Sequence, residues 1–197
     1  LGRLPAGFAA AVADAKSVLA RTANPQLADF ILDRAYFAEI RAAAQSAECP
    51  FLAGYAEILT DSTNLKSAVR TLRMGKDLEF MDSALIPGGS VSADRVVTAG
   101  DKESITALFV NTLLERAAVI GAEAVEGGSM TAFELACDNA VTAYLRKAKL
   151  VSFGPEALIA YLAAVESEIT AVRMILTGRL AGIDPDVIRE RLRDMYA

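Results

Sequence analysis

The sequence predicts an all-α protein. Alanine, leucine, glutamate, arginine and lysine, which have high helix propensity, dominate the 197 residues. Apolar residues recur at intervals of three and four, the spacing of one helix face, and runs that alternate between apolar and polar residues are almost absent. We therefore expect a fold that is helical along nearly its whole length.

The first half of the chain is expected to hold five helices. They cover residues 5–21, 25–47, 50–60, 63–75 and 77–85. Asn24 caps the second of them, because it precedes a proline whose missing N–H costs nothing at the first helical position. Asp61 and Thr63 are possible caps of the fourth. Residues 87–100, rich in glycine and serine at their start, are expected to form an irregular connection.

The second half is expected to hold four more helices, over residues 101–120, 130–150, 155–178 and 184–196. Thr131 and Glu134 have the spacing of a capping box at the start of the second of these. Gly154 and Asp184 each stand before a proline and so mark the starts of the last two.

A weak internal repeat relates the two halves. At an offset of 105 residues, Asp33 aligns with Asp138, Arg41 with Arg146 and Pro50 with Pro155; at an offset of 107, Lys66 aligns with Arg173, Gly75 with Gly182 and Asp77 with Asp184. Chance matches between alanine-rich helices are common, but this shared order of proline, basic residue, glycine and aspartate is not. We therefore predict two copies of one helical unit, residues 1–100 and 101–197.

Charge and composition exclude several classes of function. The net charge of −5 and the pI near 4.9 argue against broad binding to nucleic acid or to an anionic membrane. No window approaches the roughly 20 apolar residues that a membrane-spanning helix needs, so we expect a soluble protein. The first residues, LGRLPAGFAAAVADA, lack a starting methionine and a signal-peptide pattern, which suggests a processed product or a fragment.

Several kinds of catalytic and metal site lack the residues they need. The chain has no histidine, which excludes Ser-His-Asp and Cys-His nucleophile systems and the usual histidine-containing metal sites within it. Cys49 and Cys137 form no CxxC motif and are expected to be buried small hydrophobes in a reducing cytoplasm. The glycine pairs in IPGGSV and VEGGSM lack the spacing of a phosphate loop, and Glu166 and Glu168 do not share a helix face. We expect no catalytic, cofactor or metal site.

One basic stripe remains as a candidate for contacts with partners. Lys66, Arg70, Arg73 and Lys76 follow one another at spacings of four, three and three, so they share a helix face beside an apolar seam. The stripe is either a solvated rim of the core or a contact for a partner or phosphate. The repeat aligns Lys66 with Arg173 but aligns Arg70 and Arg73 with uncharged residues. We therefore name four candidates for partner contact: Lys66, Arg70, Arg73 and Arg173.

Two long stretches resemble a known family. TDSTNLKSAVRTLRMG followed by ALIPGGSV, and EITAVRMILTGRLAGIDPDVIRERL near the end, are similar to the C subunit of archaeal and bacterial V-type (A-type) rotary ATPases, the relative of the d subunit of vacuolar ATPases. The resemblance implies an all-helical, funnel-like fold of three related units around a pseudo-threefold axis. Against that pattern we expect only two units in this chain, the second and the third, with the first of the three repeats missing.

The resemblance also implies a function. A member of this family would sit on the membrane proteolipid ring, receive the foot of the central shaft and transmit torque for proton or sodium transport without catalysing a reaction. It would be cytoplasmic and peripheral to the membrane, with shaft and ring proteins as partners and no cofactor.

Two alternatives stay open. The first is a helical-repeat scaffold or adaptor unrelated to rotary motors. The second is an enzyme that uses clustered carboxylates in a deep cleft. Neighbouring genes that encode other ATPase subunits would favour the coupling role over the scaffold.

Overall fold

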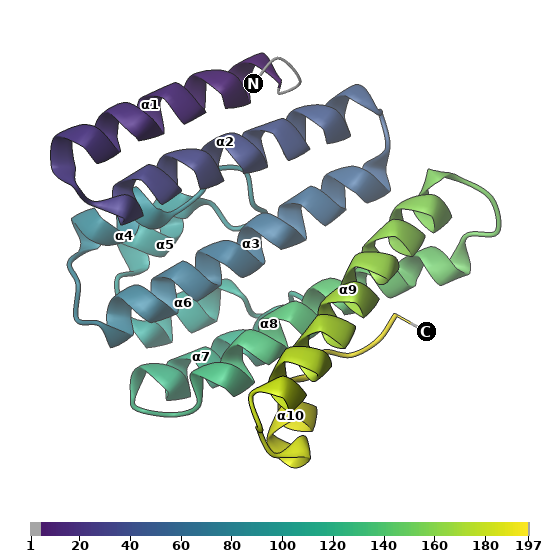
Figure 1. Cartoon of the computed structure of the whole chain (residues 1–197). Coiled ribbons are helices and arrows are strands. Elements are labelled where there is room, and N and C mark those ends of the chain that lie inside the picture. Colours follow the sequence, from purple (N-terminus) through teal and green to yellow (C-terminus); the bar gives the residue numbers. More distant parts are fainter. Residues whose placement is uncertain (1–4, 197) are drawn as a thin grey trace.

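The computed structural model describes residues 5–196, and every regular element in that range is a helix (Figure 1). This confirms the all-α prediction. Helices α1 (Ala6–Thr22), α2 (Pro25–Ser46) and α3 (Pro50–Arg73) lie side by side in antiparallel order. The remaining elements are α4 (Leu78–Ala84), α5 (Ala93–Ala99), α6 (Lys102–Leu108), α7 (Glu115–Val125), α8 (Met130–Leu145), the short 3-10 helix η1 (Arg146–Leu150), α9 (Pro155–Leu180) and α10 (Pro185–Arg191).

Most of the expected helix starts are observed. The side chain of Asn24 accepts the N–H of Gln26 at 3.0 Å, and that of Asp184 accepts the N–H of Asp186 at 2.8 Å. Pro155 begins α9 as expected. The predicted capping box is wrong: Ser129, not Thr131, caps α8 by accepting the N–H of Ala132. The chain reverses at Gly127, whose φ of 106° suits glycine, and this turn brings Ser129 to the cap position.

The two helices expected over residues 50–60 and 63–75 are one continuous helix, α3. Asp61 and Thr63 therefore lie inside a helix and cap nothing. A group of polar residues usually indicates a helix start, because their side chains compete with the backbone for hydrogen bonds. In α3 the hydroxyl of Thr60 donates to the carbonyl of Ala56, and the carboxylate of Asp61 binds a distant loop, so the backbone hydrogen bonds continue.

The prediction was wrong at four other boundaries. Residues 93–99, expected to be irregular, form α5 under the cap of Ser92. The helix expected over 101–120 is divided into α6 and α7 by a turn in which Asn111 has a φ of 61°. The helix expected over 130–150 ends in η1, and the last one stops at Arg191 because Leu192 is extended.

The core lies where α3 meets the helices of the second half. Leu65, Met81, Phe109 and Phe133 are fully buried there. Gly121 allows α7 to approach α3 closely, since a Cβ at this position would lie 2.9 Å from Cγ2 of Val69. The core therefore joins segments from both predicted units.

The division into two units stays a prediction, although the capped helix starts agree with it. Asn24 and Ser129, which cap α2 and α8, are 105 residues apart, and Asp77 and Asp184, which cap α4 and α10, are 107 apart. Within residues 5–196, none of the helices has the length and apolar character that crossing a membrane requires.

Candidate functional site

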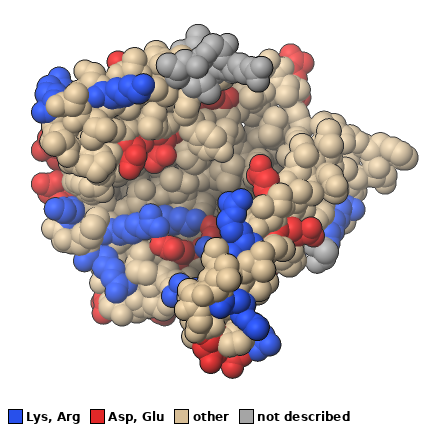
Figure 2. All heavy atoms as spheres, viewed as in Figure 1, with Lys and Arg blue, Asp and Glu red and all other residues tan. Residues whose placement is uncertain are grey.

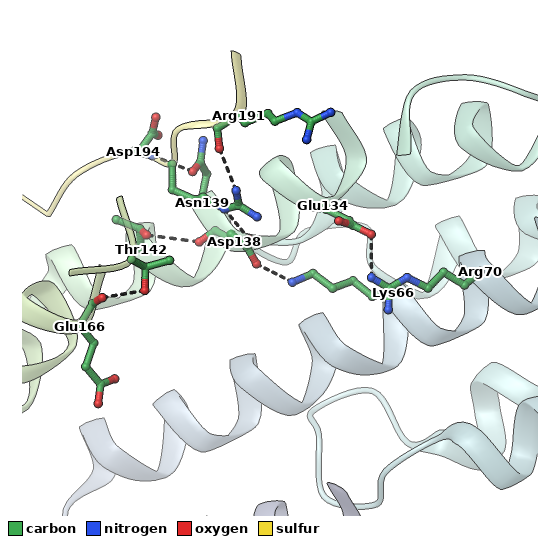
Figure 3. A network of polar contacts seen from close by, with 11 residues as sticks. Lys66, Arg70, Glu134, Asp138, Asn139, Thr142, Glu166, Arg191 and Asp194 are labelled. Atoms are coloured by element: carbon green, nitrogen blue, oxygen red, sulfur yellow. Dashed lines mark hydrogen bonds and ion pairs between the residues drawn. The ribbon is translucent and has the colours of Figure 1, made fainter. Parts of the chain in front are cut away.

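The basic stripe of α3 faces the second half of the chain. Nζ of Lys66 lies 2.5 Å from Oδ1 of Asp138 on α8, and Nη2 of Arg70 lies 2.6 Å from Oε1 of Glu134, one helical turn away on α8 (Figure 3). Two bases four residues apart on α3 thus match two acids four residues apart on α8. Lys66 and Arg70 thus hold two helices together, a role that was neither of the two expected from the sequence.

Arg73 binds backbone rather than a carboxylate. Its Nη1 donates to the carbonyl oxygens of Ala124 at 3.0 Å and Gly128 at 2.8 Å, just where α7 ends. The last carbonyls of a helix have no partner inside it and carry a partial negative charge, so a guanidinium there is favourable. Lys76 was expected on the same helix face, but α3 ends at Arg73, so Lys76 lies outside the helix, with its Nζ 5.9 Å from the centroid of the Phe80 ring.

Asp138 joins three parts of the chain. Besides Lys66, it accepts Nε of Arg193 through Oδ2 at 2.9 Å, so the segment after α10 is tied to α8 and α3. The N–H of Asp194 donates to the side chain of Asn139 on the same helix (Figure 3). We call Lys66, Asp138 and Arg193 the Asp138 network. All three side chains are partly buried, with 22 to 31% of their surface exposed.

The loop after α4 is clamped onto α3 by two polar side chains. Asn64, almost fully buried, donates to the carbonyl of Ile86 and accepts the N–H of Ile86, both at 2.8 Å. Asp61 accepts the N–H and the hydroxyl of Ser90 and the N–H of Val91. Since buried backbone groups need partners, these two residues replace the hydrogen bonds that the loop cannot make with itself.

Burial changes the acidity of two side chains in this region. Desolvation raises the pKa of Asp61, although its hydrogen bonds to Ser90 and Val91 act in the opposite direction. Desolvation also raises the pKa of Cys137 to about 12, despite the nearby ammonium of Lys66. Cys49 and Cys137 are both free and buried, as the sequence suggested. A thiol with such a pKa is not a nucleophile at neutral pH.

A groove of 240 Å³ lies between α8 and α9, next to the Asp138 network. Its polar lining includes Asp138, Glu166 and Arg193, and Asp138 is already neutralised by two cations. Among the residues that the structure describes, no three histidine, cysteine, aspartate or glutamate side chains converge to hold a metal ion.

Helix α9 has an exposed apolar face. Val172 and Leu176 are 55% and 58% exposed and, with Val165 and Ile169, they line a shallow groove of 510 Å³ that also includes Arg173. In Figure 1, α9 lies at the edge of the molecule with few neighbours. Arg173, the fourth candidate from the sequence, therefore lies on a different surface from Lys66, Arg70 and Arg73.

The sequence reasoning missed the acidic partners of the stripe and the clamp on the loop. Glu134 and Asp138 were visible as acids one turn apart on a helix, at the same spacing as Lys66 and Arg70. That match could have indicated two paired faces. Nothing local in the sequence pointed to the contacts of Asp61 and Asn64 with residues 86–91.

Comparison with known proteins agrees with the resemblance drawn from the motifs. Residues 5–191 match the model of a family described as ATP synthase (C/AC39) subunit. The chain is 25% identical over 174 residues to the C subunit of a V-type sodium ATPase of Enterococcus hirae, and the match covers 85% of this chain and 52% of that protein. It is 29% identical over 171 residues to the C subunit of an A-type ATP synthase of Halobacterium salinarum. This match covers 82% of this chain and 48% of that protein.

A similar protein of Haloferax volcanii, also the C subunit of an A-type ATP synthase, is 28% identical over 143 residues, which make up 70% of this chain and 40% of that protein. This chain spans about half the length of the curated relatives it matches. No solved structure matches it significantly.

Proposed function

The chain belongs to the ATP synthase (C/AC39) subunit family, whose members are non-catalytic parts of V-type and A-type ATPases, and on this premise we propose that it couples the central shaft to the membrane rotor ring. In this role it transmits torque between the two during proton or sodium transport. It is held at the cytoplasmic side of the membrane through the complex, in contact with shaft proteins and with the proteolipid ring.

The observation that supports this proposal most is the cross-linking of α3 to the helices of the second half. A part that transmits torque must resist bending and shear. Lys66, Arg70 and Arg73 each bridge from α3 to α7 or α8, and Asp138 extends the connection to the segment that contains Arg193. The two ion pairs of Asp138, which are partly buried, resist sliding of one helix along another, because any shift separates the charges.

The four sequence candidates have different roles in this proposal. Arg70 and Arg73 are exposed, so each can bind an acidic group of a shaft or ring protein while keeping its internal contact. Lys66 is more deeply placed and serves to position α8. Arg173 lies on the apolar face of α9 and contacts a partner there.

The coupling function is tested in the assembled ATPase of the source organism, with and without this protein. We expect ATP hydrolysis to persist and ATP-driven ion transport to be lost when the protein is omitted. Transport that continues at an undiminished ratio to hydrolysis would refute the coupling role. Crosslinks from Lys66, Lys76, Lys102 and Lys149 should reach shaft and ring proteins; crosslinks confined to soluble proteins outside the ATPase would favour the scaffold alternative.

The contact role of the stripe is tested separately with Arg70→Ala combined with Arg73→Ala. A contact role predicts a larger loss of coupling than of stability, measured as the transport-to-hydrolysis ratio and as the free energy of unfolding. The matched control is Arg116→Ala, which removes an exposed arginine that lies outside the stripe, on α7. A variant that loses stability but couples normally would leave Arg70 and Arg73 with a purely internal role.

A further inference from the structure

The segment that follows α10 is an extended strap laid on α8 and η1. Leu192 leaves α10 with a φ of −71° and a ψ of 135°, which is extended backbone. Among the described residues, the N–H and C=O groups of residues 193–196 form no hydrogen bond with another backbone group. In Figure 1 this segment runs from α10 back along α8 toward the label C. We call residues 192–196 the strap. Because the strap has no regular structure of its own, its position depends on the partners that α8 and η1 offer it.

Two side chains bind the backbone of the strap. Oδ1 of Asn139 on α8 accepts the N–H of Asp194 at 2.9 Å (Figure 3). Nη2 of Arg146, at the start of η1, donates to the carbonyl oxygen of Met195. Since almost every residue carries an N–H and a C=O, these two contacts can hold an extended peptide whatever its side chains are.

Asp138 adds selectivity for a basic side chain. Its Oδ2 accepts Nε of Arg193 at 2.9 Å, while its Oδ1 is bound to Lys66 on α3. When the strap leaves, the carboxylate keeps one cation and does not become an unpaired charge. The side chain of Arg193 is already 31% exposed, so it returns to water at little cost. This contact can therefore be exchanged for one with another arginine.

A small apolar patch adds selectivity for an aromatic side chain. Tyr196 packs against a cluster whose buried members are Leu145, Ala148 and Ala160. Nζ of Lys149 lies 5.0 Å from the centroid of the Tyr196 ring. An apolar surface on which the ring is buried and a cation near its electrons suit any aromatic side chain. The strap thus presents an arginine and, three residues later, an aromatic ring to two matching positions.

The strap also closes part of the groove between α8 and α9. Leu192 and Arg193 belong to the lining of this 240 Å³ groove, together with Thr142 of α8 and Glu166 of α9. Displacement of the strap would therefore widen the groove beside the contacts that hold the strap now.

We propose that the strap is an internal ligand of a peptide-binding site on α8 and η1, and that an extended segment of another protein displaces it. This segment has an arginine followed three residues later by an aromatic residue. The arginine binds Asp138, and the backbone of the segment binds Asn139 and Arg146. The aromatic ring packs on Leu145 and Ala148. Without a partner the strap keeps the site closed, because its attachment gives it a high effective concentration. The site would act in this way whether or not the chain couples the shaft to the ring.

The probe is the synthetic peptide LRDMY, the sequence of the strap with both ends blocked, added up to about 5 mM because it lacks the effective concentration of the attached strap. Binding is followed by heteronuclear NMR of the chain that carries Arg193→Ala and Tyr196→Ala. We expect the signals of Asn139 and Ala148 to shift. The affinity should be at least about tenfold higher than for the wild type, in which the strap occupies the site at least about 90% of the time. The control peptide LEDMY should bind at least about tenfold more weakly, since its glutamate is repelled by the acid of the site.

Hydrogen exchange tests the release of the strap in the unaltered chain, so it does not depend on the stability of a variant. The N–H of Asp194 should exchange at least about tenfold more slowly than in an unstructured peptide, because the strap is mostly bound. It should also exchange at least about a hundredfold faster than the N–H of Ala140 in α8, because the strap opens while α8 stays folded.

Three results would overturn the proposal. One is a titration in which LRDMY shifts no signal of the double variant, or binds the wild type equally well. Another is equal binding of LRDMY and LEDMY. The third is exchange of Asp194 either at the rate of an unstructured peptide or as slow as that of Ala140. Circular dichroism shows whether the double variant is folded; if it is not, Arg193→Ala alone takes its place in the titration.

Discussion

Removal of the charge of Asp138 should destabilise the protein more than removal of any other acid of the α3–α8 contact. Asp138→Asn keeps the volume of the side chain but deprives Lys66 and Arg193 of their counter-charge. Both bases are largely shielded, with 22% and 31% of their side chains exposed. They would keep the cost of partial burial and lose the interaction that offsets it.

The magnitude follows from this shielding. A hydrogen bond to a charged group contributes about 1.5–3 kcal/mol, and breaking a fully buried pair costs about 3–5 kcal/mol. Because about a quarter of each side chain reaches solvent and asparagine retains one acceptor, we expect a loss of about 2–3 kcal/mol in the free energy of unfolding. For a chain of this size the melting temperature should fall by about 4–12 °C.

The measurement is urea unfolding followed by circular dichroism, with Glu134→Gln as the matched control. Glu134 and Arg70 are 32% and 53% exposed, and such a pair contributes about 0–1 kcal/mol. A double-mutant cycle with Lys66→Met should give a coupling energy of about 1 kcal/mol or more between positions 66 and 138. If Asp138→Asn and Glu134→Gln lower the free energy of unfolding by equal amounts, the Asp138 network does not hold the two halves of the chain together.

Three further predictions concern the clamp and the buried thiol. Asn64→Ala should lower the free energy of unfolding by about 2–4 kcal/mol, because both backbone groups of Ile86 lose their buried partner; a loss below about 1 kcal/mol in urea unfolding would contradict this. Because the pKa of Asp61 is higher in the folded than in the unfolded state, the folded state takes up the proton first, and the stability that Asp61 contributes declines as the pH rises above about 4. The difference in unfolding free energy between the wild type and Asp61→Asn should therefore shrink from about pH 4 to about pH 7 in urea titrations, and a difference that grows would refute the assignment. Cys137 should resist iodoacetamide at pH 8 in the native state and react only in urea, as followed by mass spectrometry; rapid native labelling would show that its thiol is accessible.

Local signals explain what the sequence predicted correctly. A proline can begin a helix whatever lies around it, and an aspartate or asparagine before it binds the first free N–H groups, so the starts of α2, α9 and α10 were predicted. The all-helical class follows from propensity and periodicity summed over long windows. The family followed from two long ordered motifs, and the match over residues 5–191 confirms it.

Long-range contacts explain what the sequence predicted wrongly or left open. Asp61 was interpreted as a cap because an aspartate among polar residues usually ends or begins a helix, but its partners Ser90 and Val91 are about thirty residues away. The start of α5, by contrast, has a local cap, Ser92, that the prediction overlooked.

The sequence by itself determined the helical class, most helix starts, the absence of histidine chemistry and the family. Each of these depends on residue identity or on patterns along the chain, and none requires contact between distant segments. Only the tertiary structure decided that the basic stripe of α3 binds acids of α8 some seventy residues away, and that the matching face of α9 stays exposed. A helix face has the same sequence pattern whether or not another helix covers it, so its partner is known only once the chain is folded.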